Sequence, residues 1–492
     1  MTVLLYTYTD WQAGLVPLLD AALQKRGEKL FWIGRRSPGI NSAMIRRVPP
    51  GNPFKRFPEF EADDPLPTLT DPIAFEKAHL AHYTYQMNRY SKGYGSRGHK
   101  MKYFHEYRDS FHLTARRFKR LLLREDVRSI ILINMPHTGD DFLLYRVAED
   151  MGLKVTMFMV APFKNLFFST SSIEGYGLLN QATTCPLAPD IGLDAFDRQV
   201  KNTVKSYMHG VYRSNSWNLR DAFSALFSLL RRYPGFLMDP KNLRANLVEV
   251  IRLRRSLKKS RRTRREMLSK HRTVELLEWL RSLTRDPEAL PEKYVYFPLH
   301  YQPELTTVPQ GGVFGDQALA IEMLSAALPD DVSIVVKENP MQGAFNREST
   351  FANRLRQLDN VVLLHPSVSN DLLEQNCLAV GVVTGTAGWE AIRDERPCIC
   401  FGHAWYLDCP GVHKFEPGLD LEHVLNNPPR RAATEAYLGE VIARSHEGVV
   451  YEFFLDSDDP GLKARNFDAL VKLFVELTFD EASTTFASRT GV

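Results

Sequence analysis

A strand–loop–helix pattern that repeats between residues 294 and 410 constrains the fold of this chain more than any other feature. The strand segments read YVYFPL, SIVVK, VVLL and LAVGVV, and each ends in a polar loop that carries Gly or Pro. Apolar strands that alternate with helices are typical of a parallel sheet covered by helices on both faces. Ligands bind such sheets beyond the carboxyl ends of the strands. The pattern therefore predicts a ligand site in these loops.

The N-terminal part of the chain predicts a second sheet of the same kind. We therefore expect an α/β protein with a GT-B-like arrangement, in which two Rossmann-like parallel-sheet domains face a cleft and carry added helical segments. A Pro- and Gly-rich stretch at 38–72 reads as a surface connection, and 72–124 as helical. The strands are expected at 3–8, 30–34, 129–134 and 154–160, and the helices at 11–25, 140–151, 318–328, 389–393, 435–445 and 461–477.

The length of 492 residues is too great for a single hydrophobic core. Four regions are expected. Residues 1–193 form an N-terminal Rossmann-like domain with a helical insertion, and 194–290 form a basic helical linker. Residues 291–450 form the C-terminal Rossmann-like domain, and 451–492 form helices that pack back on the domains.

Cysteine content and hydropathy indicate the compartment. The five cysteines form no CxxC pair, and their odd number favours a reducing cytoplasm over a disulfide framework. The N-terminus lacks the features of a secretory signal, and no uncharged apolar run approaches the roughly 20 residues that span a bilayer. We expect a cytoplasmic protein, either soluble or peripheral at the inner membrane.

A basic tract at residues 252–272 holds eleven Lys or Arg and one acid, Glu266. One interpretation is a solvated helix between domains. The other is a surface for anionic lipid heads or a polyanionic glycan, because each basic residue near a charged membrane adds about 1 kcal/mol. Nucleic acid is disfavoured, since the tract lacks interleaved aromatic residues and the other regions show no nucleic-acid motif.

The loop Thr384–Gly388 follows a strand of small and β-branched residues and opens a helix. A helix N-terminus presents unpaired N–H groups and partial positive charge, so the loop predicts a phosphate site. The alternative is that Thr386 is a plain N-cap without a ligand. Lys337 and Asn339 end another strand, where they suit a phosphate and a base or ribose, or alternatively Lys337 extends to water.

Further candidates follow other strands. The stiff loop His300–Glu304 is dense in polar groups, whereas Ser367 reads as a ligand contact or as a helix cap. Trp405, Tyr406, Asp408 and His413 either cover a ligand or pack the domain boundary. In the N-terminal half, Asp10, His137, Asp140 and Asp141 suit proton transfer, or each caps a helix. The binding candidates are His300, Gln302, Lys337, Glu338, Asn339, Ser367, Thr384, Gly385, Thr386, Ala387 and Glu390, and the catalytic candidates are Asp10, Glu304, Asp140 and His137.

Three motifs in this order, FPLHYQPELTT, VVKENP and VTGTAGWEAI, resemble bacterial capsule polysaccharide biosynthesis proteins, especially the retaining β-Kdo transferase group. The resemblance covers residues 294–411 well and the N-terminal half loosely. It implies a GT-B glycosyltransferase that moves a sugar, Kdo among the candidates, from a nucleotide donor to a surface glycan. It also implies a donor pocket in the C-terminal domain and an acceptor on the N-terminal domain.

One departure concerns the donor. The group shows His-Pro after Lys-Glu, where this chain has Asn339-Pro340, so a nucleotide sugar other than CMP-Kdo is open. The chain lacks a DxD pair placed for a metal, so we expect neither a metal nor a cofactor besides the sugar nucleotide. Rival functions are a sugar-nucleotide epimerase, a polyol-phosphate transferase and a non-catalytic glycan-binding partner of capsule assembly.

Overall fold

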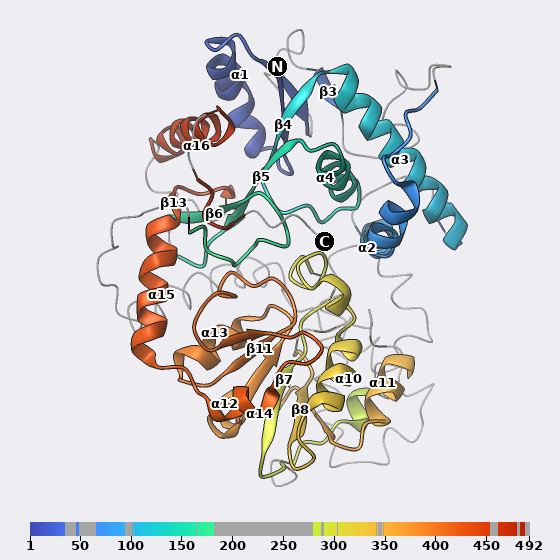
Figure 1. The fold of residues 1–492 in the computed structure, drawn as a ribbon, viewed down its shortest axis with the longest axis vertical. Coiled ribbons are helices and arrows are strands. Elements are labelled where there is room, and N and C mark those ends of the chain that lie inside the picture. Colours follow the sequence, from blue (N-terminus) through green and yellow to red (C-terminus); the bar gives the residue numbers. More distant parts are fainter. Residues whose placement is uncertain are drawn as a thin grey trace, which may run out of the picture.

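Two sheets flanked by helices lie one above the other in the computed structural model of the chain (Figure 1). Both sheets are mainly parallel, which confirms the predicted α/β class with two parallel-sheet halves. The basic tract at 252–272 lies outside the described residues, so the interpretations given for it stay open. The structure describes residues 1–34, 46–48, 65–93, 101, 103–163, 165–181, 279–286, 290–302, 304–340, 342, 347, 349–452, 461–479 and 483–487.

The N-terminal sheet has seven strands in the order β13-β6-β5-β4-β1-β2-β3. The strands from β3 to β5 are parallel, whereas β6 and β13, which were not predicted as strands, pair antiparallel at one edge. Only 161–165 separates β5 from β6, too few residues for the crossover that parallel strands need. The strands are β1 Thr2–Tyr6, β2 Lys29–Ile33, β3 Arg46–Val48, β4 Val127–Leu132, β5 Lys154–Val160, β6 Leu166–Thr170 and β13 His446–Glu447. β3 lies within the stretch expected as a connection, which corrects that expectation.

Helices cover both faces of this sheet because side chains alternate along each strand. Val3 and Leu5 pack in a core with α1 and α16, whereas Leu4 and Tyr6 pack in another core with α3 and α4. The helical region expected at 72–124 is confirmed as α2 and α3. The helices of this half are η1 Gln12–Leu15, α1 Val16–Gln24, α2 Pro72–Gly93, α3 Phe104–Arg124, α4 Asp140–Asp150 and α16 Leu462–Phe479.

The C-terminal sheet has six strands, all parallel, in the order β12-β11-β10-β7-β8-β9. The helix expected at 318–328 is confirmed as α10, but the helix expected from Trp389 begins earlier, at Thr386. The strands are β7 Tyr294–Pro298, β8 Ser333–Lys337, β9 Val361–Leu364, β10 Ala379–Val382, β11 Cys398–Cys400 and β12 Val412–Lys414. The helices are η5 Gly312–Gly315, α10 Gln317–Ala327, α11 Ser349–Arg356, α12 Asn370–Asn376, α13 Thr386–Arg393, α14 Leu421–Asn426 and α15 Arg431–Arg444.

Both sheets share one winding rule. The chain starts in a middle strand, β1 or β7, winds outward through two further strands, and then returns to the other side of the starting strand. The return strands are β4 and β10. The point where the winding reverses is the place where ligands bind in open α/β sheets. The fold therefore contains two such points, one in each half.

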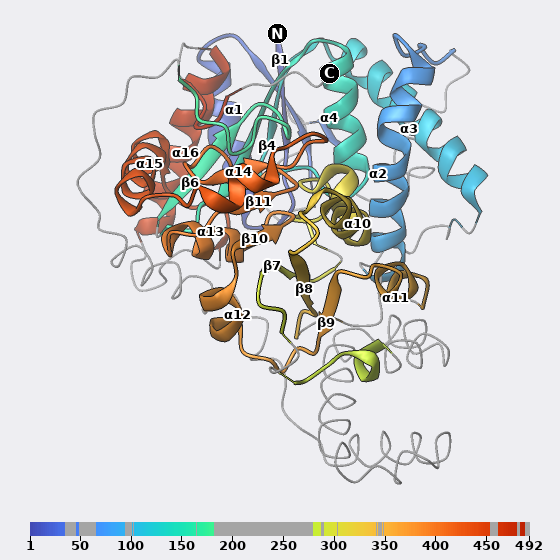
Figure 2. The same cartoon turned by 60° about the horizontal axis from the view of Figure 1, so that its bottom comes forward.

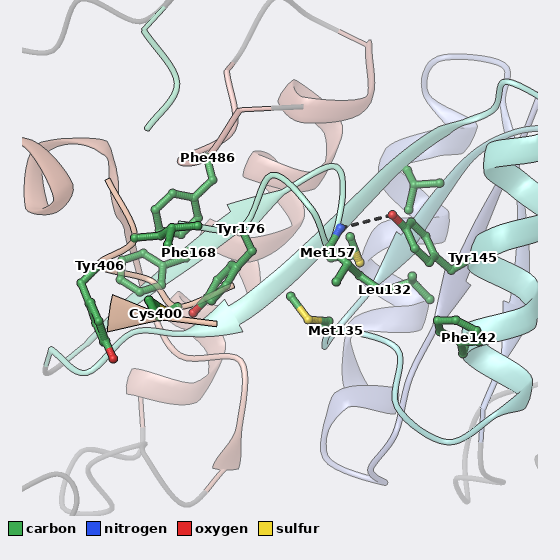
Figure 3. Close-up of a cluster of buried hydrophobic side chains, with 14 of the residues drawn as sticks. Leu132, Met135, Phe142, Tyr145, Met157, Phe168, Tyr176, Cys400, Tyr406 and Phe486 are labelled. Atoms are coloured by element: carbon green, nitrogen blue, oxygen red, sulfur yellow. Dashed lines mark hydrogen bonds between the residues drawn. The ribbon is translucent and has the colours of Figure 1, made fainter. Parts of the chain in front are cut away.

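A continuous apolar core joins the two halves (Figure 3). It runs from Leu132 and Phe142 in the N-terminal half to Cys400 and Tyr406 in the C-terminal half. The ring of Trp405 lies 6.2 Å from that of Phe168, centroid to centroid. The loop containing Trp405 therefore packs the boundary between the halves, one of the two roles expected for it.

Gly177 and Asp408 connect the two halves at the same boundary. Gly177 has a φ of +93°, and a Cβ there would lie 1.8 Å from the Ala404 carbonyl oxygen. The backbone N–H of Leu179 donates to Asp408 Oδ2 at 3.1 Å, and the Asp408 N–H donates to the Gly177 carbonyl. Asp408 thus holds the halves in register.

The end of the chain returns to the N-terminal sheet. Strand β13 pairs with β6, and α16 packs against α1 and β5. The Phe474 ring stacks on Phe158 of β5 with centroids 4.5 Å apart, and Thr485 accepts the Ser169 N–H in its hydroxyl. The N-terminal sheet is thus completed by residues from beyond 445.

His446 makes the docking of β13 sensitive to acid. Its Nε2 lies 2.6 Å from Ser169 Oγ, and burial lowers the pKa of the imidazole to about 4. Between pH 6.5 and 4 the unfolded chain binds a proton that the folded chain does not, so stability is lost as the pH falls through that window. We expect His446→Gln to remove about 1–3 kcal/mol of this loss.

Urea unfolding at pH 7 and pH 4.5 measures the effect of His446→Gln. His423→Gln, at an exposed site on α14, is the control and should leave the pH dependence unchanged. Part of the pH dependence will persist, because burial also lowers the pKa of His79 to about 3 and of His300 to about 4. An unaltered difference between the two pH values in His446→Gln would contradict the assignment.

Candidate functional site

The loops after β7 and β10 meet where the winding of the C-terminal sheet reverses. The Thr384 N–H donates to His300 Nε2 at 3.3 Å. A Cβ added to Gly385 would lie 3.1 Å from the His300 ring, tighter than most contacts of real side chains. The absence of a side chain at Gly385 therefore lets the ring lie against this turn. The structure brings together three predicted binding residues here.

His300 is a neutral hydrogen-bond donor. Its side chain is 9% exposed, and burial, with a smaller contribution from the Arg347 charge, lowers its pKa to about 4. Since Nε2 accepts the Thr384 N–H, the proton of the neutral ring is on Nδ1. Within the described residues, Nδ1 has no hydrogen-bond partner. This N–H is available to a ligand.

The N-terminus of α13 is open. Its N-cap is Gly385, which has no side chain to accept a hydrogen bond, and Thr386 is the exposed first residue of the helix. The alternative interpretation of Thr386 as the N-cap is therefore wrong. The first N–H groups of the helix favour an anion. The Thr384 hydroxyl, by contrast, donates to the Thr306 carbonyl at 2.7 Å.

Glu338 faces the protein interior. Arg347 Nε lies 2.5 Å from Glu338 Oε2, both side chains are fully buried, and the Trp279 indole donates to the same oxygen at 2.8 Å. Arg347 also donates to Gln302 Oε1 at 3.2 Å and to the His300 carbonyl at 3.4 Å. Sequence reasoning missed Arg347, which fixes the loop that carries His300. Ligand contacts of Glu338 and Gln302 stay predictions.

The other candidates are dispersed around this junction. Lys337 at the end of β8 is buried and donates to Asn370 Oδ1, and burial lowers its pKa. Ser367 is exposed and lies 2.7 Å from His365 Nδ1. Asn339, Glu304, Ala387 and Glu390 are half-buried, the last two on α13.

In the N-terminal half, the loops after β1 and β4 fold around Asp141 rather than around Asp10 or Asp140. Asp141 is fully buried and accepts the Tyr8 hydroxyl at 2.9 Å. Asp10 is exposed in the turn before η1, because β1 ends at Tyr6, two residues before the predicted end. Asp140 is buried at the start of α4. The His137 ring stacks on Tyr8 with centroids 5.4 Å apart.

Helix α2 contacts both loop systems, and it packs against α3 and α4 of its own half (Figure 2). The Gly139 N–H donates to Gln86 Oε1 at 2.8 Å, and the neighbouring Tyr85 hydroxyl lies 3.5 Å from Gln302 Nε2. One turn earlier, His82 is hydrogen-bonded to the Gly312 backbone. The loop after β4 and the loop after β7 are therefore anchored to adjacent residues of one helix.

Among the residues that the structure describes, no group of three His, Cys, Asp or Glu side chains has the geometry to hold a metal ion. No helix in the described ranges is long and apolar enough to cross a membrane.

Comparison with solved structures gives distant likenesses. The chain is similar to the β-Kdo 2,7 transferase KpsC of Thermosulfurimonas dismutans at 11% identity and a TM-score of 0.29, over 81% of this chain and 96% of that one. It is also similar to the UDP-GlcNAc 2-epimerase of Methanocaldococcus jannaschii at 10% identity and a TM-score of 0.24, over 89% of this chain and 98% of that one. The likeness to the calicheamicin glycosyltransferase CalG4 has 10% identity and a TM-score of 0.22, over 96% of this chain and 98% of that one. At these scores the likenesses carry no activity over to this chain.

Sequence comparison gives a family match for part of the chain. No curated protein matches the chain. The family of capsule polysaccharide biosynthesis proteins matches over residues 284–453, a segment that holds β7 to β13 and all three motifs. The resemblance stated from those motifs is confirmed over residues 284–453, which match the family of capsule polysaccharide biosynthesis proteins.

Proposed function

We propose that this chain is a glycosyltransferase that moves a sugar from a nucleotide-activated donor to a capsule or other surface polysaccharide. The observation that carries the proposal is the open N-terminus of α13 beside the neutral donor His300, within the family segment. An anionic ligand suits both groups. A donor phosphate would meet the first N–H groups of α13, the Thr386 hydroxyl and the His300 Nδ1–H.

The same groups suit the departure of the nucleotide. When the sugar leaves its phosphate, negative charge grows on the phosphate oxygens. Fixed N–H donors and a helix dipole stabilise that charge without reorganising, which is the largest single contribution in many enzymes. Because these donors are already in place, we propose that transfer needs no metal ion.

The donor nucleotide is proposed from the three motifs and from Asn339. CMP-Kdo is one candidate, because the motifs resemble the β-Kdo transferase group. Asn339 stands where that group has a histidine and can hydrogen-bond to a phosphate or ribose without carrying charge. UDP-, GDP- and CDP-sugars are therefore part of the same proposal. A cytoplasmic, membrane-peripheral location and a glycan or lipid-linked acceptor complete it, with an anionic membrane contact at 252–272 and no nucleic acid.

A donor panel tests the function. The purified chain is mixed with CMP-Kdo and with UDP-, GDP- and CDP-sugars, the melting temperature is measured, and products with a capsule oligosaccharide are identified by mass spectrometry. We expect one donor class to raise the melting temperature by mass action and to give an elongated oligosaccharide. An epimerised donor without transfer would make the chain an epimerase, and no donor response at all would overturn the proposal.

Thr386→Val tests the placement of the phosphate. Loss of the hydroxyl should weaken nucleotide binding by about 1–3 kcal/mol, roughly 5- to 150-fold in Kd. Thr350→Val is the matched control, because Thr350 is an exposed threonine in the first turn of α11 in the same half. Isothermal titration with the donor that responds gives both values. Equal Kd values for the two variants would place the phosphate elsewhere.

A further inference from the structure

The points where the two sheets reverse their winding are chemically opposite. In the C-terminal half, the N-terminus of α13 has no side-chain cap. In the N-terminal half, the carboxylate of Asp141 covers the start of α4. It accepts the N–H groups of Thr138 and Phe142 at 2.7 Å and that of His137 at 2.9 Å. The start of α4 therefore carries negative charge where α13 offers positive charge.

This difference separates two kinds of ligand. A phosphate at α4 would meet the Asp141 carboxylate and compete for N–H groups that are already bonded. A neutral hydroxyl meets no such repulsion. The N-terminal reversal point therefore suits the hydroxyl that receives the sugar.

The geometry of His137 suits proton transfer. Its Nδ1 lies 2.8 Å from the Met135 carbonyl oxygen, which accepts only from a protonated nitrogen. Nδ1 therefore carries the proton of the neutral ring, and Nε2 is the basic nitrogen. The ring is stacked on Tyr8 at an interplanar angle of 22°. Tyr8 is fixed in turn, because its hydroxyl and the His137 N–H donate to the same Asp141 oxygen.

We propose that His137 is the base that takes the proton of the acceptor hydroxyl, and that Asp141 and Tyr8 are positioning residues that hold it. This inference rests on the proposed glycosyl transfer. Nε2 takes the proton while the hydroxyl oxygen bonds to the anomeric carbon of the donor. The bond from that carbon to the phosphate oxygen breaks, and its electron pair leaves on the phosphate. The imidazolium then returns its proton to water.

The position of the loop supports this role. His137 belongs to the loop whose Gly139 is bonded to Gln86 of α2, next to Tyr85, which faces Gln302 of the donor loop. Asp10, the leading carboxylate by sequence, is exposed and four residues beyond the end of β1. The structure therefore favours His137 over Asp10.

His137→Gln tests the proposal in the full-length chain with the donor that responds in the panel. We expect kcat to fall by roughly 10²- to 10⁴-fold, while the nucleotide Kd changes less than about twofold, since the phosphate site is in the other half. Imidazole added to His137→Ala should restore part of the turnover. His105→Gln, at an exposed histidine of α3, is the control for substitution of a histidine.

Tyr8→Phe tests the positioning role. It keeps the stacked ring but removes the hydroxyl that donates a hydrogen bond to the Asp141 carboxylate. The carboxylate then stabilises the imidazolium more strongly, so the acid limb of the kcat profile should move to higher pH. A purely structural role of Tyr8 would lower activity equally at all pH values, and that outcome would overturn its assignment.

The outcomes separate the two proposals. If the wild-type chain binds no donor and forms no product, glycosyl transfer itself is wrong. If the wild-type chain transfers sugar and His137→Gln keeps full kcat, the base assignment is wrong while the function stands. A larger loss in Asp10→Asn than in His137→Gln would return the role to Asp10.

Discussion

Replacement of Arg347 by Met is expected to lower the free energy of unfolding by about 3–5 kcal/mol. The guanidinium is fully buried, with Nε 2.5 Å from Glu338 Oε2, and its removal leaves a charged carboxylate inside the protein. The Trp279 indole and the Asn339 N–H remain as its partners, but neither carries a positive charge. Urea unfolding, with the midpoint and slope fitted separately, measures the loss.

Two further variants identify the cause of that loss. Arg354→Met breaks ion pairs with both Asp316 and Glu322, and because the Arg354 side chain is 38% exposed the loss there should be smaller, about 1 kcal/mol. The double variant Arg347→Met with Glu338→Gln removes the uncompensated charge and should recover part of the stability. A double variant less stable than Arg347→Met would show that packing, rather than charge, accounts for the effect.

Phe474→Ala is expected to cost about 3–5 kcal/mol, the range for a large aromatic side chain removed from a core. Phe474 is fully buried in α16 and stacks on Phe158 of β5, so its loss opens the face of the N-terminal sheet that α16 covers. Lys472→Ala on the same helix is the control, because its side chain is 80% exposed. Urea unfolding again gives the comparison.

A loss below about 1 kcal/mol in Phe474→Ala would mean that α16 contributes little to the N-terminal half. A loss of similar size in both variants would show that burial of the Phe474 ring is not the cause, because alanine favours the helix at both sites.

The C-terminal sheet was predictable from sequence because its strands are buried on both faces and read as continuous apolar runs. The edge strands of the N-terminal sheet could not be predicted in this way. Strand β13 has only two residues, and its partner β6 lies far away in the sequence. No local sequence pattern therefore predicts that they pair. The β5–β6 hairpin was missed because FFST was not recognised as a strand after so short a turn.

The sequence likewise predicted one part of the candidate site and missed another. Strand ends predicted the junction of His300 with Thr384 and Gly385, because loops after neighbouring parallel strands share one edge. Arg347 was missed, since it follows no strand. Its partner Glu338 was predicted to bind a ligand because it follows a strand, and that role stays a prediction. Asp141 rather than Asp140 accepts the N–H groups of the loop before α4. The sequence could not distinguish these two neighbours, because the difference lies in the direction of each side chain.

The return of the chain end to the N-terminal sheet has a consequence for synthesis on the ribosome. Strands β1 to β6 emerge first, but their edge partner β13 and the covering helix α16 follow much later. At about 5–20 residues per second, the wait between β6 and β13 lasts roughly 15–55 seconds. During that time Val3, Leu5 and Phe158 lack the apolar surface of α16. The half made first is therefore completed last, and this face of its sheet stays uncovered by α16 until then.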